Sequence, residues 1–203
     1  LRQRQRNEVS THEYQPKTRR NLDGAIKLHQ ESYIKKIVER FLPDGPSSRV
    51  QRGSLPYSAD FLLHVNEALA QSVPQYPELV RAFQERVGSL MYAATSTRPD
   101  IAFAVHQLCQ CLQKPTPALM RECEHVLSYL SRHASVGLTY TREHARLQGF
   151  SDASWETARA TSGRLVLWQS AALSWAWRKQ QSIAQSTCQA EIMALSEATK
   201  DVV

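Results

Sequence analysis

The chain has 203 residues, of which 42% are hydrophobic and 22% are charged, so it is long enough to form one large domain or two small ones with a buried core. No apolar run approaches the roughly 18–20 residues that a membrane-spanning helix needs, and the sequence therefore predicts no membrane contact. The formal net charge of +6 belongs to residues 1–52, which hold 12 Lys and Arg against 6 Asp and Glu.

The first segment, residues 1–21, is polar and aperiodic, and we predict a disordered basic tail there. Its "LRQRQR" and "KTRR" runs could bind phosphates or could be solvated charges. The chain begins with Leu and not with Met, so we expect a processed product or a fragment.

Residues 22–77 begin with "GAIKLHQ", whose alternation predicts a short strand. "ESYIKKIVERF" then places apolar residues at helical spacing. Residues 43–77 contain five of the nine prolines and little periodicity, so a long loop with local turns is predicted there.

Residues 78–145 are predicted to form a helical region, in which three helices bury their apolar faces against one another. Thr116 is the expected N-cap of the third helix, with Pro117 at its first position. The apolar stripes predict a core made of Leu79, Phe83, Leu90, Ile101, Val105, Leu108, Leu127 and Leu130. The cysteines fit no zinc-binding spacing and are expected to be small buried thiols: Cys109, Cys111, Cys123 and Cys188.

The apolar period changes after residue 145. Strands near 146–153, 163–169 and 172–178 are predicted to form an antiparallel meander that packs against a helix over 188–201, capped by Ser186 or Thr187. The expected fold class is α+β.

Two carboxylates in this last region are candidates for a metal-dependent nuclease site. Asp152 lies in "GFSDASW" on a predicted strand, and Glu191 lies in "CQAEIMALSEA" on the predicted helix. Mg²⁺ prefers oxygen ligands, and two-metal phosphodiester hydrolysis therefore uses converging carboxylates. By themselves, an Asp on a strand and a Glu on a helix are equally consistent with ordinary surface charges.

Longer stretches resemble a known family. "RVGSLMYAATSTRPDIAFAVHQL", "HVLSYLSRHASVGLTY", "GFSDASW", "TSG" and "LSWAWRKQQSIAQSTCQAEIMALSEATKDVV" together resemble the C-terminal part of copia-type retrotransposon polyproteins, from about Val87 to Val203. The resemblance extends more loosely to "IKLHQESYIKKIVERF", which is similar to the end of the reverse-transcriptase domain.

The resemblance implies a helical connection or thumb-like unit, followed from residue 146 by an incomplete RNase H-like antiparallel sheet with one helix. It implies that Asp152 and Glu191 are the first and second Mg²⁺ ligands and catalytic residues. Arg178 and Lys179 match the family's third strand, near which an RNA–DNA hybrid passes. We also assign Arg98 to nucleic-acid binding.

Several departures predict that catalysis is lost. Ala160 replaces the first Ser of the family's Ser-Thr-Ser-Gly motif. The family usually has an acidic, charged insertion before that motif, whereas the corresponding segment here, "ETARATSG", is short. The next catalytic Asp normally follows on a fourth strand, whereas the chain ends first, and Asp201 is expected on the same helix as Glu191. The polymerase motif "YxDD" is absent from the sequence. We therefore expect an inactive fragment of a reverse transcriptase and RNase H polyprotein, with weak or absent Mg²⁺ binding and weak binding to an RNA–DNA hybrid or other nucleic acid.

Two other functions remain open at this stage. The chain could be a secreted or host-delivered effector made from such a fragment, non-enzymatic and bound to a protein partner. It could also be part of a working nuclease completed by a longer parent or a partner chain. A retroelement product would be intracellular, whereas an effector would be secreted.

Overall fold

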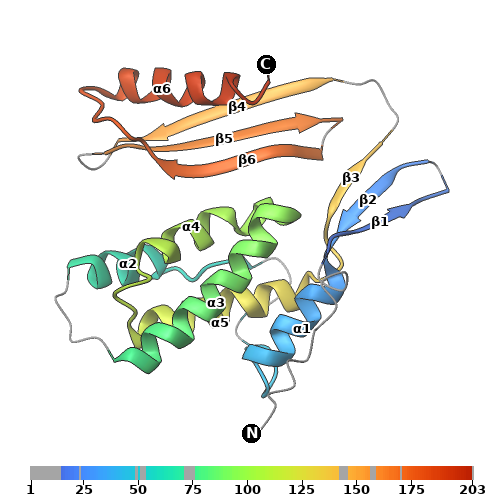
Figure 1. Cartoon of the computed structure of the whole chain (residues 1–203), viewed down its shortest axis with the longest axis vertical. Coiled ribbons are helices and arrows are strands. Elements are labelled where there is room, and N and C mark those ends of the chain that lie inside the picture. The colour runs from blue at the N-terminus through green and yellow to red at the C-terminus, as the bar shows by residue number, and fades with distance from the viewer. Residues whose placement is uncertain are drawn as a thin grey trace, which may run out of the picture.

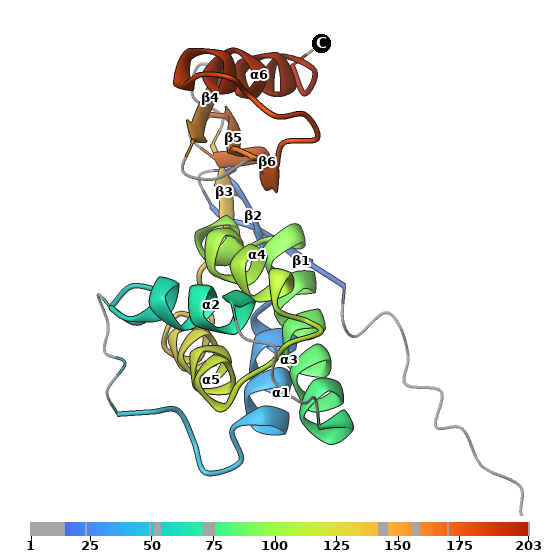
Figure 2. The ribbon, with the colours of Figure 1, turned by 90° about the vertical axis from the view of Figure 1, so that its left-hand side faces the viewer.

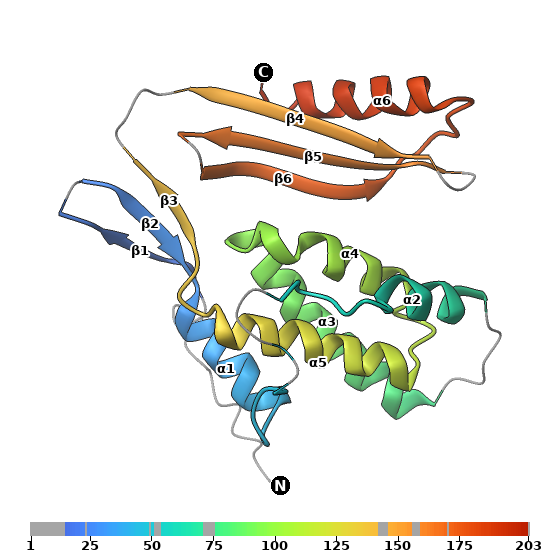
Figure 3. The same ribbon diagram turned by 180° about the vertical axis from the view of Figure 1, so that it is seen from behind.

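The computed structural model of the chain describes residues 15–22, 24–48, 50, 54–70, 76–141, 146–155, 159–169 and 171–202. A helical unit forms one body, and a three-stranded sheet covered by one helix forms a second body beside it (Figure 1). A second small sheet flanks the helical unit where the chain crosses between the two bodies (Figure 3). In the described part of the chain, no helix combines the length and apolar character needed to cross a bilayer.

The helical unit shares one core among its helices. Its elements are α1 (Glu31–Phe41), α2 (Phe61–Ala70), α3 (Pro77–Ser96), a 3₁₀ turn η2 (Pro99–Ile101), α4 (Ala102–Gln110) and α5 (Pro117–Arg132). The fully buried residues of this core come from helices far apart in the sequence, including Ile34, Phe61, Phe83, Leu108 and Leu127. Figure 2 shows α1, α2, α3 and α5 gathered in this body, with α4 nearest the larger sheet.

The predicted three-helix packing is confirmed by α3, α4 and α5. Seven of the eight predicted core residues are buried, and Leu79 is half-buried in the first turn of α3. The Thr116 side chain caps α5 as expected, because its Oγ1 accepts a 3.2 Å hydrogen bond from the amide of Leu119. The apolar spacing and the cap signal together located these helices correctly.

The prediction of buried thiols is right for two of the cysteines. Cys111 and Cys123 are fully buried, and burial raises the pKa of the Cys111 thiol to about 11. Cys109 is half-buried, whereas Cys188 is exposed on the last helix.

The prediction of a long loop over residues 43–77 is wrong for its second half. Helix α2 occupies Phe61–Ala70 and buries Phe61, Val65 and Ala68 against the shared core. These residues are spaced by four and three positions, so they lie along one face of a helix.

The small sheet has the order β1-β2-β3 and consists of β1 (Lys17–Arg20), β2 (Ile26–His29) and β3 (Leu138–Tyr140). Both pairs are antiparallel. The prediction of disorder over 1–21 is therefore wrong for Lys17–Arg20, which pair their backbone with β2; residues 1–14 lie outside the described residues. Strand β1 is exposed along its whole length, so backbone pairing and not side-chain burial defines it.

The larger sheet is the predicted meander, with the order β4-β5-β6 and antiparallel pairing throughout. Its strands are β4 (Leu147–Ser154), β5 (Thr161–Trp168) and β6 (Ala171–Lys179), and Trp175 and Trp177 lie on β6 as predicted. Helix α6 (Thr187–Thr199) packs across β4 and β5 and is capped by Ser186, whose side chain accepts from the amide of Gln189 at 3.1 Å. The α+β class is thus confirmed.

Candidate functional site

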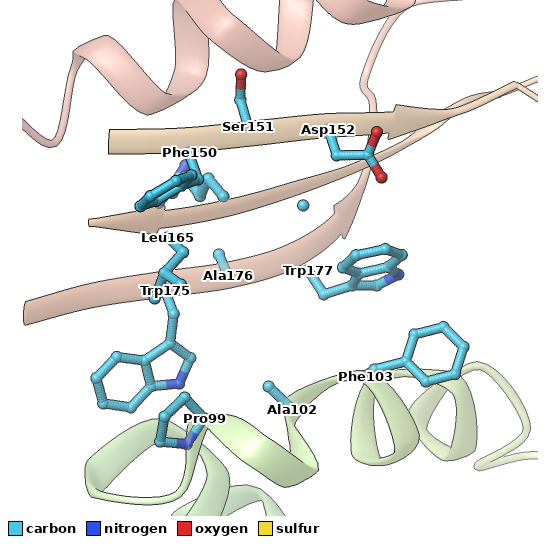
Figure 4. A pocket seen from close by; sticks show the side chains of 12 residues that line it. Pro99, Ala102, Phe103, Phe150, Ser151, Asp152, Leu165, Trp175, Ala176 and Trp177 are labelled. Atoms are coloured by element: carbon cyan, nitrogen blue, oxygen red, sulfur yellow. The ribbon is translucent and has the colours of Figure 1, made fainter. Parts of the chain in front are cut away.

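Asp152 belongs to a row of residues that crosses the larger sheet. It lies opposite Gly163 on β5, and Gly163 lies opposite Trp177 on β6. Residues directly opposite each other share a face of the sheet, whereas successive residues alternate between faces. Ala153 packs with Ala190 on the α6 side, so Asp152 is directed to the other side, toward α4. Figure 4 shows this difference, with Ser151 directed toward α6 and Asp152 away from it.

The face that carries Asp152 forms an open, largely apolar pocket of about 460 Å³ with the helical unit. Aromatic rings form two sides of it, with Phe150 and Trp175 at one end and Phe103 and Trp177 at the other (Figure 4). A Cβ at Gly163 would lie only 2.5 Å from Cζ3 of Trp177, so the absence of a side chain there lets the indole lie across β5.

Three contacts fix the two bodies around this pocket. Phe103 on α4 meets Trp177 edge to face, with ring centroids 5.3 Å apart. Trp175 Nε1 donates a 2.7 Å hydrogen bond to the carbonyl of Ala94 at the end of α3. The hydroxyl of Tyr140 donates to the carbonyl of Ala172 at 2.6 Å. The first two contacts join β6 to α4 and α3 at the pocket, and the third joins β6 to β3 of the small sheet.

Glu191 contacts the backbone of the neighbouring strand. Its Oε1 accepts a 3.2 Å hydrogen bond from the backbone amide of Ala153, on strand β4 at the edge of the sheet. The structure thus brings Glu191 next to the residue that follows Asp152 but directs the two carboxyl groups to different sides of the strand.

The remaining acidic groups near the end of α6 neutralise an arginine. Arg164 on β5 forms ion pairs with Glu197 at 3.3 Å and with Asp201 at 2.8 Å. Asp201 also accepts a 2.7 Å hydrogen bond from the Ser174 hydroxyl. Within the residues that the structure describes, no group of three or more His, Cys, Asp or Glu side chains could hold a metal ion. The assignment of Asp152 and Glu191 as Mg²⁺ ligands stays a prediction; in the fold, Asp152 is directed toward α4, whereas Glu191 comes from α6 on the other side of β4.

Arg178 and Lys179 lie together at the exposed end of β6. Because neighbouring strand residues alternate, Arg178 faces the α6 side, where it borders a small pocket with Met193 and Glu197. Lys179 faces the α4 side. Both cations are exposed, so they are accessible on opposite sides of one strand end.

The charges of this strand end affect His106 on α4. Burial lowers the pKa of His106, and the positive charges of Lys179 and then Arg178 lower that pKa further.

Arg98 is buried, and its assignment to nucleic-acid binding is wrong on that ground. Its side chain is fully inaccessible, with Nη2 at 2.6 Å from Oδ2 of Asp100 and Nε at 2.9 Å from Oδ1. Its Nη1 donates to the carbonyl of His133 at 2.9 Å, and its guanidinium lies 5.8 Å from the ring centroid of Tyr129. Burial raises the pKa of Tyr129, and the adjacent Asp100 carboxylate raises it further. A guanidinium enclosed in this way has no exposed donor to offer a phosphate.

The sequence signals did not identify the aromatic pocket or the role of Arg164. The sequence predicted the strand that carries Trp175 and Trp177, but only the fold places Phe103 of α4 against Trp177. Arg164 lies on a strand with apolar neighbours, and only its position under α6 reveals its acidic partners.

Comparisons with known proteins give two kinds of relative. The chain is 42% identical over 122 residues to the secreted RxLR effector protein 161 of Plasmopara viticola, which covers 58% of this chain and 86% of that protein. It is 28% identical over 184 residues to the retrovirus-related Pol polyprotein from transposon TNT 1-94 of Nicotiana tabacum, and 30% identical over 198 residues to that from transposon RE1 of Arabidopsis thaliana.

The two polyprotein matches cover 87% and 88% of this chain, respectively. The chain spans only 13% of the length of each polyprotein. No family model matches the chain, and no solved structure matches it. The similarity to several Pol polyproteins over nearly the same span agrees with the motifs quoted from the sequence. Over most of its length, the chain is therefore similar to one segment of the retrovirus-related Pol polyproteins of copia-type retrotransposons.

Proposed function

We propose that the chain is a transposon-derived Pol segment, at the junction of reverse transcriptase and an RNase H-like domain, that binds nucleic acid without hydrolysing it. The observation that carries the non-catalytic part is the hydrogen bond between Glu191 Oε1 and the Ala153 amide. That bond holds one family carboxylate at the strand edge, while Asp152 is directed into the aromatic pocket.

Mg²⁺ binding is weak or absent in this proposal. Mg²⁺ keeps most of its water ligands and is held by carboxylates that approach it together. In-line hydrolysis needs two ions roughly 3.5–4 Å apart, which stabilise the attacking and leaving oxygens. Because they approach β4 from different sides, Asp152 and Glu191 are expected to offer neither arrangement. The nucleic-acid part is supported by the exposed Arg178 and Lys179 and by the Pol relatives, with an RNA–DNA hybrid or another nucleic acid as a weakly bound partner.

The chain should therefore cleave an RNA–DNA hybrid no faster than a buffer control in the presence of Mg²⁺. A hybrid labelled on its RNA strand and incubated with the chain at several MgCl₂ concentrations measures this on a denaturing gel. Asp152→Asn and Glu191→Gln, made separately, should leave the background rate unchanged. Cleavage that requires Mg²⁺ and disappears in Asp152→Asn would show that the carboxylates converge on an ion in solution, against the proposal.

A second candidate function, a delivered effector, is favoured by the 42% identity over most of the secreted effector of Plasmopara viticola. The two candidates differ in the size and place of the product. An antibody against residues 76–141 should detect a band well above 23.0 kDa in cell extracts if the chain is made within a Pol polyprotein. A band near 23.0 kDa in the medium would instead support the effector.

A further inference from the structure

The small sheet carries four basic side chains on one face. Strands β1 and β2 pair Lys17 with His29 and Arg19 with Lys27. These two pairs are two residues apart along each strand, so all four side chains lie on the same side of the sheet. We call this set, Lys17, Arg19, Lys27 and His29, the basic ribbon face. Thr139 of β3, which pairs with Lys27, adds a neutral side chain to it.

The register makes this face electrostatically unfavourable for the protein by itself. Like charges directly opposite each other destabilise an antiparallel pair, and Arg19 is directly opposite Lys27. A shift of the β1–β2–β3 pairing by one residue would separate these two charges. It would also move Leu28 and Leu138 away from each other, although they now share the other face of the sheet. Leu138 is buried there, which fixes the register.

Neighbouring groups do little to neutralise the basic ribbon face. Arg19 and Lys27 have no ion pair within the described part of the chain, and Lys17 Nζ bonds only to the neutral hydroxyl of Ser32 at 3.3 Å. Among the described carboxylates, Glu31 feels the charge of this face, but it pairs with Lys35 at 2.7 Å. The pKa of Glu31 is lowered first by Lys35 and only then by His29 and Lys27. Within the described part of the chain, this face therefore keeps most of its positive charge.

We propose that the basic ribbon face binds the phosphate backbone of a nucleic-acid strand. This inference rests on the proposed nucleic-acid function and gives it a site separate from Arg178 and Lys179. Lys17 lies one row from the Arg19–Lys27 pair, roughly 6.8 Å along the ribbon, because each strand residue advances about 3.4 Å. His29, opposite Lys17, accepts a 3.4 Å hydrogen bond from the Glu31 amide at Nδ1. Cations in two successive rows suit a linear polyanion better than a single small anion, and contacts limited to phosphates carry no sequence preference.

An anionic membrane is the other polyanion to consider, and the geometry argues against it. Ile26, an exposed apolar residue, lies opposite Arg20 and Tyr140 in the sheet. It lies in Arg20's row, one residue from Lys27, so its side chain lies on the face opposite the basic ribbon face. A membrane that met the basic ribbon face would not bury that side chain. Leu22 in the turn is fully exposed and is the reason for including vesicles in the test.

The test compares matched charge removals in the full chain. Arg19→Gln/Lys27→Gln removes two cations from the basic ribbon face, and Arg20→Gln/Arg121→Gln removes two exposed cations elsewhere. Anisotropy of a fluorescein-labelled 20-nucleotide single-stranded RNA, measured across KCl concentrations, gives the affinity and its salt slope. The ribbon variant should lower the slope of log K against log salt by about 1.4 and lower affinity about tenfold at low salt, and the control should change the slope by less than half as much.

The thermal midpoint gives a second readout. Without RNA, the ribbon variant should melt at or slightly above the wild-type temperature at low salt, because a repulsive pair has been removed. Equal effects of the two variants on RNA binding would overturn the assignment of this face. Loss of binding to phosphatidylserine vesicles with RNA binding unchanged would overturn it in favour of a membrane.

The same data separate the inference from the function on which it rests. If the wild-type chain binds no RNA at any salt concentration, the proposed nucleic-acid function fails. If the wild type and the ribbon variant bind RNA equally while Arg178→Gln/Lys179→Gln is impaired, the function stands and the inference alone fails.

Discussion

Leu108→Asp should lower the free energy of unfolding by about 4 kcal/mol or more. Leu108 on α4 is completely buried in the core shared by α1–α5. The substitution removes apolar packing and places a carboxyl group where no partner is available, so the group must either be buried as a charge or bind a proton. Both effects destabilise the folded state.

The matched control is Leu63→Asp on α2. Leu63 is also a helical leucine, but 56% of it is exposed, and an acidic residue in the first turn of a helix interacts favourably with the positive N-terminus. Its free energy of unfolding should stay within about 0.5 kcal/mol of the wild type.

Two signals in urea can follow the two bodies separately. Circular dichroism at 222 nm reports mainly on the helices, whereas the four tryptophans all lie at or beyond residue 155, near or within the larger sheet. We expect the urea midpoint measured by dichroism to fall sharply in Leu108→Asp. The midpoint measured by fluorescence should fall less, because the larger sheet is coupled to the helical unit through contacts such as that between Phe103 and Trp177. Equal midpoints for Leu108→Asp and the wild type would contradict the packing of α4.

The fold was predictable where local pattern and tertiary packing agree. Helices α3 to α5 each present a single apolar stripe, and Thr116 and Pro117 mark the start of α5. Helix α2 escaped prediction because Leu62, Leu63 and Leu69 fill positions outside its buried stripe, so the sequence "FLLHVNEALA" shows no clear period. Those leucines are exposed, and nothing in the local sequence distinguishes them from the buried residues.

Strand β1 had no side-chain signal at all. Its residues Lys-Thr-Arg-Arg are polar and all exposed, and a strand of this kind forms only because β2 offers backbone partners in register. The sequence analysis named the charges of "KTRR" as possible phosphate contacts, but their alignment opposite Lys27 and His29 depends on a pairing that composition does not reveal.

In the candidate site, the elements that carry the two carboxylates were predictable, but the directions of the side chains were not. The sequence placed Asp152 on a strand and Glu191 on a helix, and the fold has both there. The direction of each carboxylate depends on which face α6 covers. That face holds the small residues Ser151 and Ala153 opposite Ala190, so close packing of α6 directs Asp152 to the far side. The alternation of small residues on β4 was the signal that could have indicated this.

Arg98 shows the limit of reading a cation from sequence. Arg98 was assigned to nucleic-acid binding from the sequence, but Asp100 lies where the planar guanidinium can bind it through two nitrogens. The pair joins η2 to the end of α5 through the carbonyl of His133. Arg98 is therefore expected to act on stability.

Arg98→Ala should lower the free energy of unfolding by roughly 3–5 kcal/mol, because removing one member of a buried ion pair leaves the other groups without their partner. Asp100 would lose three hydrogen bonds from Arg98, and the His133 carbonyl would lose the donor that connects α5 to η2. Arg98→Lys should recover only part of the loss, because an ammonium group cannot reproduce the two-nitrogen contact.

Arg81→Ala is the control for the loss of a positive charge. Arg81 is an arginine of the same helical unit whose side chain is 85% exposed, and its ion pair with Glu85 measures 3.5 Å. An exposed pair of this kind contributes about 0–1 kcal/mol, so this variant should unfold close to the wild type. If Arg98→Ala has a wild-type urea midpoint yet binds the labelled RNA more weakly than Arg81→Ala, Arg98 contacts nucleic acid after all and the buried clamp is wrong. A lower midpoint for Arg98→Ala, partly restored in Arg98→Lys, would instead establish that this conspicuous cation stabilises the junction between η2 and α5.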